Sequence, residues 1–293
     1  MRVTDSHSLT AGPELAGDPP ITGSPSASPR TPRFNPGIPH PARVYSYWLG
    51  SKDHYPADRK AAEEVAAQRP QVVASARANR AFLARSVRYL AGQYGIRQFL
   101  DIGPGLPVPG ATHQVAQAIA PESRVVYVDS DPLVLSHARA LLTPSREGTC
   151  EYVGADLRDT KVIVREAART LDFAQPAAVI LVAILHFLAD ADDPAGVVAA
   201  LTAPLAPGSF VVISHLTADF APDQVACAVA AYNALIPAGI TARTHREVTA
   251  LFGALALVPP GVVPVSEWRP EHAPVHSVSA DMYAGLATVR RPR

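Results

Sequence analysis

The sequence predicts an α/β fold with a doubly wound, mostly parallel sheet. Between residues 98 and 214, short apolar segments alternate with helix-length segments. The first apolar segment runs into a glycine-rich bend, Asp101-Ile102-Gly103-Pro104-Gly105. Such an alternation requires right-handed crossovers, which place helices on both faces of a parallel sheet. With 293 residues, of which 48% are hydrophobic, the chain is long enough to bury the core of one main domain.

The residues before this alternation fall into two parts. Residues 1–40 are rich in proline and serine and have no helical or strand period, so we expect a disordered tail. They also lack the charged start and apolar run of a signal peptide. Residues 41–96 are expected to form a helical lid, with helices at 57–68 and 71–93 that Pro70 separates and Gly95 ends. Residues 97–293 then form the core domain.

The core elements follow in a regular order. We expect strands at 98–102, 124–128, 150–154, 177–183 and 209–214, with helices at 112–120, 132–142, 161–170 and 194–205 between them. Two more helices are expected at 223–235 and 245–252, followed by strand-like segments at 262–268 and 282–289. No helix-length segment separates the last two strands, so they are able to pair antiparallel at the edge of the sheet.

Acidic residues stand at the tips of successive predicted strands. Asp101 ends the first strand, and the two glycines behind it allow a ligand to approach the backbone. Asp129 ends the second strand, where a carboxylate is placed to accept both hydrogen bonds of a ribose diol. Asp131 precedes Pro132, which is typical of a helix N-cap, so Asp129 remains for the ligand.

The third strand ends in Asp156, which Leu157 follows. In a nucleoside site Asp156 accepts the adenine amine and Leu157 contacts the ring; a loop carboxylate or a helix cap is the alternative. Acids at three neighbouring tips are harder to explain by capping, and together they outline a bound adenosine. The predicted cofactor-binding residues are one upstream tyrosine, the bend and the strand tips, namely Tyr45, Asp101, Gly103, Gly105, Asp129, Ser130, Asp156, Leu157 and Ala183.

The fourth strand delivers His186 to the same edge of the sheet. Because the ordinary pKa of histidine lies near neutrality, His186 is the candidate catalytic residue that accepts a proton from a substrate. The alternative is a structural histidine bonded to a cofactor or to the backbone. His215, which follows the fifth strand, is a similar but weaker candidate.

Aromatic residues are concentrated between residues 43 and 55 in a chain that has few of them. Aromatic faces such as that of Tyr45 stabilise sulfonium or ammonium cations, and Lys52 or Asp53 is able to hold a carboxylate or an amine. Simple packing is the alternative. On the next helix, the polar residues of the run Arg77-Ala78-Asn79-Arg80 form either a solvated face or part of the cleft.

Composition argues against several classes of partner. Lysine plus arginine number 26 and aspartate plus glutamate number 26, so no net positive field attracts nucleic acid or an anionic membrane. The longest apolar run, at 177–189, contains His186 and is shorter than the roughly 20 residues that span a bilayer. Cys150 and Cys227 lack the spacing of a zinc site or a redox pair, so we expect reduced, buried thiols, no metal and a cytoplasmic protein.

The bend at 101–105, Asp129 and the tip Ala155-Asp156-Leu157 resemble those of the class I S-adenosylmethionine-dependent methyltransferases. Within that group the chain is similar to an actinobacterial S-adenosyl methyltransferase family formerly described as a domain of unknown function. The resemblance covers about residues 41–290. Its motifs are ARVY continuing to KD at 42–53, RANRAFL at 77–83, RQFLDIG at 97–103, LHF at 185–187 and WRP at 268–270.

This resemblance implies a Rossmann-like, seven-stranded sheet with an antiparallel last strand and S-adenosylmethionine as the cofactor. It implies that the bend lies against the methionine part, Asp129 against the ribose, and Asp156 with Leu157 against adenine. The expected partner is a small-molecule acceptor with an O, N or C nucleophile, and neither the acceptor nor the oligomeric state follows from the sequence.

The chain departs from the family at two places. Pro104 stands where many relatives carry a small polar residue, which leaves the bend intact because only its flanking glycines need free backbone angles. Ser46, Trp48 and Ser51 stand where the family usually has Asp, Leu and Gly. The second departure lies in the predicted lid and bears on the acceptor.

Two other functions stay open at the level of sequence. A protein that binds S-adenosylmethionine as a sensor, without methylating anything, needs the same cofactor residues, and only turnover separates it from an enzyme. A dinucleotide oxidoreductase fits the Rossmann-like layout, but the bend lacks the third glycine at dinucleotide spacing. A methyltransferase is the preferred interpretation, with alignment and exclusion of water as the protein's main contribution.

Overall fold

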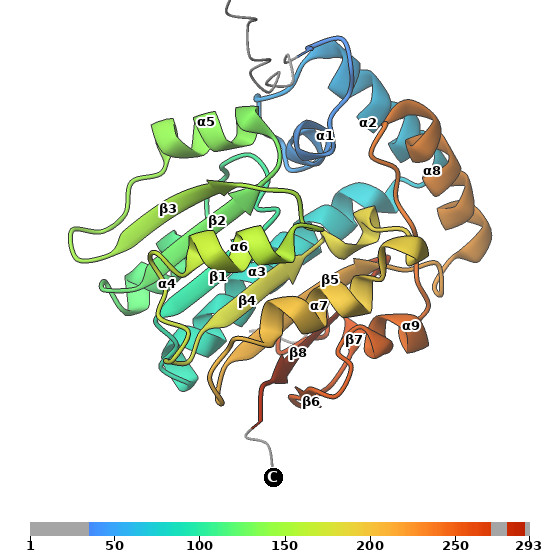
Figure 1. Cartoon of the computed structure of the whole chain (residues 1–293). Coiled ribbons are helices and arrows are strands. Elements are labelled where there is room, and N and C mark those ends of the chain that lie inside the picture. Colours follow the sequence, from blue (N-terminus) through green and yellow to red (C-terminus); the bar gives the residue numbers. More distant parts are fainter. Residues whose placement is uncertain (1–34, 271–279, 291–293) are drawn as a thin grey trace, which may run out of the picture. The chain divides into compact units, whose positions relative to one another are not determined.

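The computed structural model describes residues 35–270 and 280–290 and contains one central β-sheet (Figure 1). Its strands are β1 (Gln98–Ile102), β2 (Arg124–Asp129), β3 (Thr149–Gly154), β4 (Ala178–Val182), β5 (Phe210–Leu216), β6 (Ala256–Leu257), β7 (Val263–Pro264) and β8 (Met282–Thr288). Their order across the sheet is β3-β2-β1-β4-β5-β8-β6, and β7 also pairs with β8. The first five strands are parallel and β8 is antiparallel, which confirms the predicted fold class.

The chain order reverses beside β1. Strands β2 and β3 extend the sheet on one side of β1, whereas β4, β5 and β8 extend it on the other. In open α/β sheets, ligands bind outside the carboxyl ends of the strands at such a reversal. The glycine-rich bend follows β1 and therefore lies at this point.

Helices cover both faces of the sheet (Figure 1). They are α1 (Pro41–Trp48), α2 (Pro56–Gln68), α3 (Gln71–Gln93), α4 (Thr112–Ile119), α5 (Pro132–Leu141), α6 (Thr160–Ala167), α7 (Pro194–Thr202), α8 (Pro222–Leu235) and α9 (His245–Ala250). Apolar residues of α3 and α4, such as Phe82 and Ala116, pack on one face of the sheet. Ile163 of α6, Leu201 of α7 and Val248 of α9 pack on the other. The sheet is thus buried on both sides, as its continuous apolar strands require.

Helices α1, α2 and α8 pack against one another at the carboxyl ends of the strands (Figure 1). Val65 of α2 and Tyr232 of α8 belong to their shared apolar core. Arg43 of α1 and Asp58 of α2 form a buried ion pair with an Nε–Oδ2 distance of 2.8 Å. Because breaking a buried ion pair leaves a charge without its partner, this contact holds α1 firmly to α2.

Several expectations differ from the structure. Residues 41–48 form the eight-residue helix α1, whereas the sequence had indicated only a segment dense in aromatic residues there. The expected strand at 262–268 pairs with β8 only through Val263 and Pro264, and β6 adds another two-residue strand, so the sheet has eight strands. The two cysteines were expected to be buried, but Cys150 is half-buried and Cys227 is exposed on the solvent-facing side of α8.

Residues 1–34, which contain most of the expected tail, lie outside the described residues. The described residues belong to one compact unit, Asn35–Arg293, and the boundary expected at residue 96 stays a prediction. In the part of the chain that the structure describes, no helix combines the length and the apolar character needed to cross a membrane. No cluster of metal-binding side chains occurs among those same residues.

Candidate functional site

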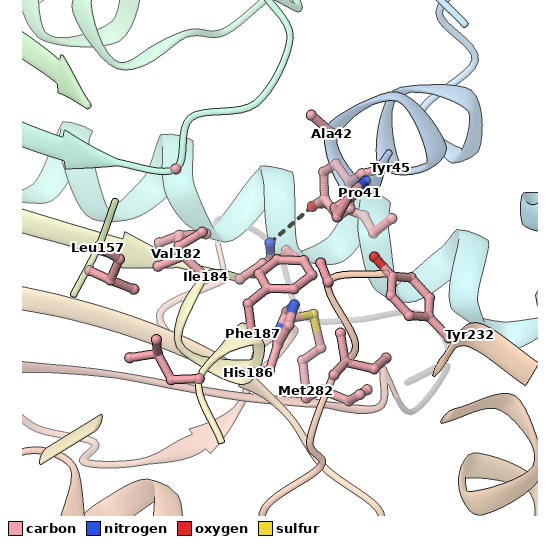
Figure 2. Close-up of a pocket in the computed structure, with 18 of the residues that line it drawn as sticks. Pro41, Ala42, Tyr45, Leu157, Val182, Ile184, His186, Phe187, Tyr232 and Met282 are labelled. Carbon is pink, nitrogen blue, oxygen red and sulfur yellow. Dashed lines mark hydrogen bonds between the residues drawn. The ribbon is translucent and has the colours of Figure 1, made fainter. Parts of the chain in front are cut away.

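A cavity of about 520 Å³ lies where the strand tips meet α1, α2 and α8 (Figure 2). Cavities of this size commonly hold small ligands. What we call the strand-tip half is lined by Asp101, Gly103, Pro104, Asp129, Ser130, Ala155, Asp156, Leu157 and Ala183. What we call the helix-walled half is lined by Trp48, Val65, Arg69, Val72, Phe187, Val225, Ala228, Val229, Tyr232, Asp281 and Met282. The side chain of His186 points into the same cavity (Figure 2).

The bend after β1 passes close to the loop after β4. Gly103 has a φ of +70°, and its N–H donates to the Val128 carbonyl at 2.8 Å. A Cβ at position 103 would lie 2.4 Å from Cδ1 of Ile184. Ala183, which precedes Ile184, also has a positive φ of 55°. Only glycine fits at position 103, because a side chain would be both strained and in collision.

Asp101 lies buried at the start of the bend. Its Oδ2 accepts a hydrogen bond from Oγ1 of Thr112 at 2.6 Å. Burial raises the pKa of Asp101 to about 6, and the positive charge of Arg80 acts in the opposite direction. Arg80 itself lines the cavity, and its Nε is buried without a hydrogen-bond partner among the described residues. A carboxylate and a guanidinium thus stand near each other at this end of the cavity.

Asp129 lines the cavity at the end of β2. Burial raises the pKa of its carboxyl to about 6, and Oδ1 accepts the N–H of Asp131 at 2.9 Å. Asp131 is the N-cap of α5, since its Oδ1 accepts the N–H of Leu133 at 2.8 Å. As expected, Asp131 caps the helix and Asp129 faces the cavity.

Asp156 lines the cavity but is not a helix cap, because the N-cap position of α6 is Asp159. Its Oδ1 accepts the N–H of Arg158 at 2.8 Å and lies 3.2 Å from the Arg158 Nη1. Leu157 is 8% exposed and faces both the cavity and the sheet core. The third strand tip therefore offers an apolar surface beside a carboxylate that is held by Arg158.

A chain of hydrogen bonds connects α1 with the strand tips. The Tyr45 hydroxyl donates to the Ala76 carbonyl at 3.0 Å and accepts from Nδ2 of Asn79 at 2.9 Å. Oγ of Ser214 in turn donates to Oδ1 of Asn79 at 2.5 Å and accepts the N–H of Ala183 at 3.0 Å. Burial raises the pKa of Tyr45, so its phenol stays protonated and its ring lines the cavity.

His186 lies in the turn after β4, and its backbone carbonyl accepts the N–H of Thr241 at 2.8 Å. Burial, together with the neighbouring His215 and Arg243, lowers the pKa of His186 well below its usual value. Its ring makes no hydrogen bond among the described residues, and Nδ1 is fully buried. His186 is therefore a neutral imidazole with hydrogen-bonding capacity left for a ligand.

His215 does not reach the cavity. It is completely buried, with Nδ1 2.7 Å from the Leu216 carbonyl and Nε2 2.9 Å from Nη1 of Arg243. Because the guanidinium only donates, Nε2 accepts and Nδ1–H donates. Arg243 also binds the Leu188 carbonyl at 2.9 Å, which holds the turn that carries His186. The weaker of the two histidine candidates is thus structural.

The structure brings most of the predicted site residues to one cavity. Those that line it are Tyr45, Asp101, Gly103, Asp129, Ser130, Asp156, Leu157, Ala183 and His186. Gly105 lies beyond it, on a smaller adjoining cavity. Lys52, Asp53 and Arg77 are exposed and do not line the cavity, so no carboxylate or amine is held there by the first two.

Other lining residues were undecided or missed at the level of sequence. Asn79 and Arg80 were undecided, and both line the cavity. Tyr232 and the ion pair between Arg69 and Asp281 were missed. The sequence does mark Tyr232 as unusual, because it is the one aromatic residue of the alanine-rich helix α8.

The chain was compared with known proteins. A family described as S-adenosyl methyltransferase matches residues 28–290. A DUF574 family protein from Streptomyces avermitilis MA-4680, whose crystal structure is known, has 42% sequence identity to this chain. The match covers 87% of this chain and 98% of that protein, with a TM-score of 0.83. A protein from Thermobifida fusca YX, assigned as a methyltransferase, is 39% identical, with coverages of 87% and 96% and a TM-score of 0.80. No curated protein matches the sequence.

Proposed function

Because this chain belongs to the S-adenosyl methyltransferase family and is an S-adenosylmethionine-dependent methyltransferase, we propose that its acceptor is a small molecule bound in the helix-walled half. The supporting observation is one cavity whose strand-tip half carries three carboxylates and whose helix-walled half is apolar apart from the paired Arg69 and Asp281, an indole N–H and the hydroxyl of Tyr232. When bound, S-adenosylmethionine supplies a methyl group already activated on a sulfonium. The chain's contribution is then to align the acceptor and exclude water.

The strand-tip half fits the nucleoside part of the cofactor. Asp129 has a desolvated carboxylate at the tip of β2, which suits two ribose hydroxyls. Ser130 lies beside it. Asp156 and Leu157 offer a hydrogen-bond acceptor and an apolar surface, which suit the amine and the ring of adenine. The backbone of Gly103 passes close to the side chain of Ile184, the residue after Ala183, and both Gly103 and Ala183 have a positive φ.

The methionine part of the cofactor carries an ammonium group and a carboxylate, so its binding site needs both an anionic and a cationic side chain. We assign its ammonium group to Asp101 and its carboxylate to Arg80, whose Nε has no partner among the described residues. Guanidinium groups bind carboxylates in a fork geometry. The ring of Tyr45 borders the same space and is suited to face a sulfonium.

His186 is the proposed proton acceptor. Its imidazole is neutral, because burial lowers the pKa, and neutral imidazole carries a lone pair for the proton of an acceptor group. Helices α1, α2 and α8 act as the lid that keeps water away from this proton. Asp53 and Lys52 have no part in the proposal, since both are exposed.

Family membership favours this function over a dinucleotide oxidoreductase. Measuring turnover distinguishes methyl transfer to a small molecule from mere binding of S-adenosylmethionine by a sensor. The protein is incubated with S-adenosylmethionine and small-molecule extracts of actinobacterial cells, and S-adenosylhomocysteine release is measured. We expect release that depends on the extract. Cofactor binding without any release, across chemically broad extracts, would favour the sensor.

The assignment of Arg80 is tested by binding alone. S-adenosylhomocysteine carries the amino-acid zwitterion and methylthioadenosine does not, so their affinity ratio measures that contact. We expect Arg80→Gln to weaken S-adenosylhomocysteine about tenfold or more, in line with the loss of a charge-assisted hydrogen bond, and to leave methylthioadenosine unchanged. Arg77→Gln, on the exposed side of the same helix, is the control. An equal loss for both ligands would mean that Arg80 is merely structural.

A further inference from the structure

The charges of the helix-walled half neutralise each other. Nε of Arg69 donates to Oδ2 of Asp281 at 2.9 Å and Nη2 donates to Oδ1 at 3.0 Å, while Nη1 donates to Oε1 of Gln224. The hydrogen bond to Asp281 raises the pKa of Arg69. No other cation or carboxylate lies among the residues that define this half. A ligand here meets no unpaired charge.

Two other polar side-chain groups belong to this half. The indole N–H of Trp48 donates to the Ala62 carbonyl at 3.1 Å, which leaves the hydroxyl of Tyr232. Tyr232 is 4% exposed, extends from α8 into the cavity (Figure 2) and makes no hydrogen bond among the described residues. Burial raises the pKa of its phenol, so the hydroxyl stays protonated and is able to donate or accept. Because Tyr232 lines the cavity, a ligand bound there is able to complete the hydrogen bonds of this hydroxyl.

Three aromatic rings border this half, those of Trp48, Phe187 and Tyr232. Aromatic rings bind other aromatic rings through stacked or edge-to-face contacts, in addition to the apolar area that they bury. An ammonium or carboxylate ligand would have to leave water without a counter-charge in this half, which is strongly unfavourable. Neutral aromatic ligands escape that penalty.

We propose that the methyl acceptor is a neutral hydroxylated aromatic molecule, with Tyr232 as a specificity-determining residue; this rests on the proposed function. The new bond joins the acceptor oxygen to the methyl carbon as the carbon–sulfur bond breaks. S-adenosylhomocysteine is released, and the hydroxyl proton passes to His186 and then to water. The apolar wall selects the ring, and the tyrosine hydroxyl selects its polar substituent.

Three probes with one ring system test the charge preference. They are 2-naphthol, 2-naphthoate and 2-naphthylmethylammonium, which are neutral, anionic and cationic near pH 7.5. Each is titrated into the full-length protein saturated with S-adenosylhomocysteine. We expect 2-naphthol to bind at least about tenfold more tightly than either charged probe. Equal or tighter binding of a charged probe, or no binding of 2-naphthol, would overturn the proposal.

Two variants locate the probe. Tyr232→Phe should weaken 2-naphthol about threefold to tenfold, as expected for one neutral hydrogen bond, and leave the charged probes unchanged. Val229→Asp puts a carboxylate into the helix-walled half and should shift the preference toward 2-naphthylmethylammonium by about tenfold. Ala230→Asp adds the same charge on the exposed side of α8 and should not. Equal effects of the two aspartates would contradict the proposed location.

The titration with S-adenosylhomocysteine comes first and separates the two proposals. If S-adenosylhomocysteine itself does not bind, the cofactor assignment fails before any probe is added. If it binds with wild-type affinity to each variant and the probe preferences are absent, only the acceptor class is wrong. Retained cofactor binding also shows that each variant is folded.

Discussion

The two halves of the cavity use charge in opposite ways. In the strand-tip half, Asp101 and Asp129 are desolvated carboxylates whose pKa burial raises to about 6. Arg80, which lines the cavity and acts electrostatically on Asp101, has an Nε with no hydrogen-bond partner among the described residues. In the helix-walled half, Arg69 and Asp281 bind each other in two places. Unpaired charge in a buried site is costly and is kept where a ligand supplies the partner. The contrast indicates a polar, partly charged ligand at the strand tips and a neutral one beside the helices.

The most severe test of this contrast is Asp129→Asn, which removes charge from the strand-tip half at nearly constant shape. We expect the affinity for S-adenosylhomocysteine to fall about 100-fold, because two charge-assisted hydrogen bonds to the ribose become neutral or are lost. Isothermal titration calorimetry measures the change. Asp159→Asn, at the start of α6 and away from the cavity, is the control and should bind normally. Unchanged binding in Asp129→Asn would remove Asp129 from the site.

Gly103→Ala tests the backbone of the same half. The added Cβ would have a strained φ and would collide with Ile184, so the bend must shift. We expect cofactor affinity to fall about tenfold, which corresponds to 1–2 kcal/mol of strain. Gly95→Ala is a matched control, since its φ of +65° is similar and no atom lies within 4 Å of the new Cβ. It should lower the thermal midpoint and leave cofactor binding intact.

The pH dependence of binding reports the two raised carboxylates. A ribose and an ammonium bind the ionised forms, so affinity should increase as the pH rises through 6. From pH 7.5 to pH 5 we expect a loss of about tenfold for each carboxylate that contacts the cofactor. Calorimetry at pH 5, 6 and 7.5 measures this loss. The dependence should be shallower in Asp129→Asn, and a flat profile in the wild-type protein would mean that neither carboxylate contacts the cofactor.

The same shifts predict the opposite trend for the stability of the protein without ligand. A raised pKa means that the folded state holds these protons more firmly than the unfolded state does. The contribution of both groups to the free energy of unfolding is therefore greatest below pH 4 and declines as the pH rises to about 6. Ligand binding and folding thus respond to these two carboxylates with opposite signs.

The smallest expected effect concerns the hydrogen bonds by which Tyr45 connects α1 with the strand tips. Tyr45→Phe removes a hydroxyl that bonds both Ala76 and Asn79, and leaves the buried Asn79 amide with one partner fewer. We expect the free energy of unfolding to fall by about 1–2 kcal/mol, measured by chemical denaturation. Tyr47→Phe, whose hydroxyl bonds Glu63 at the surface, should change it by less than about 0.5 kcal/mol. Similar losses in both variants would mean that the buried hydrogen bonds of Tyr45 add nothing.

The halves also differ in how far the sequence predicts them. The sequence was able to place Asp129 and Asp156 at one cavity because the tips of parallel strands meet at the same edge of the sheet. Arg77 and Arg80 both lie on α3, and the local sequence does not distinguish them. The packing of α3 decides that Arg80 lines the cavity whereas Arg77 is exposed. The core helices and strands were predictable from their hydrophobic periodicity, which is a local property of the sequence.

The helix-walled half was not predictable, because its parts come from distant segments. Arg69 and Asp281 are 212 residues apart, and no local pattern marks them as partners. Tyr232 faces the cavity only because α8 packs on α2 in one orientation. Likewise β7 is short because its pairing with β8 ends after two residues, which propensity alone does not determine. Tertiary packing outweighs local preference at each of these positions.

The bond between Arg69 and Asp281 has a consequence for the order in which the protein is completed. Asp281 directly precedes β8, the strand that lies between β5 and β6 in the sheet although it follows both of them in the sequence. On the ribosome, the helices before β1 and all five parallel strands emerge before Asp281 does, and domains generally fold as units once their chain is available. The helix-walled half is therefore completed by a segment that is translated after all of its other lining residues. A nascent chain is thus able to form the five parallel strands and their tips before it is able to complete the helix-walled half of the cavity.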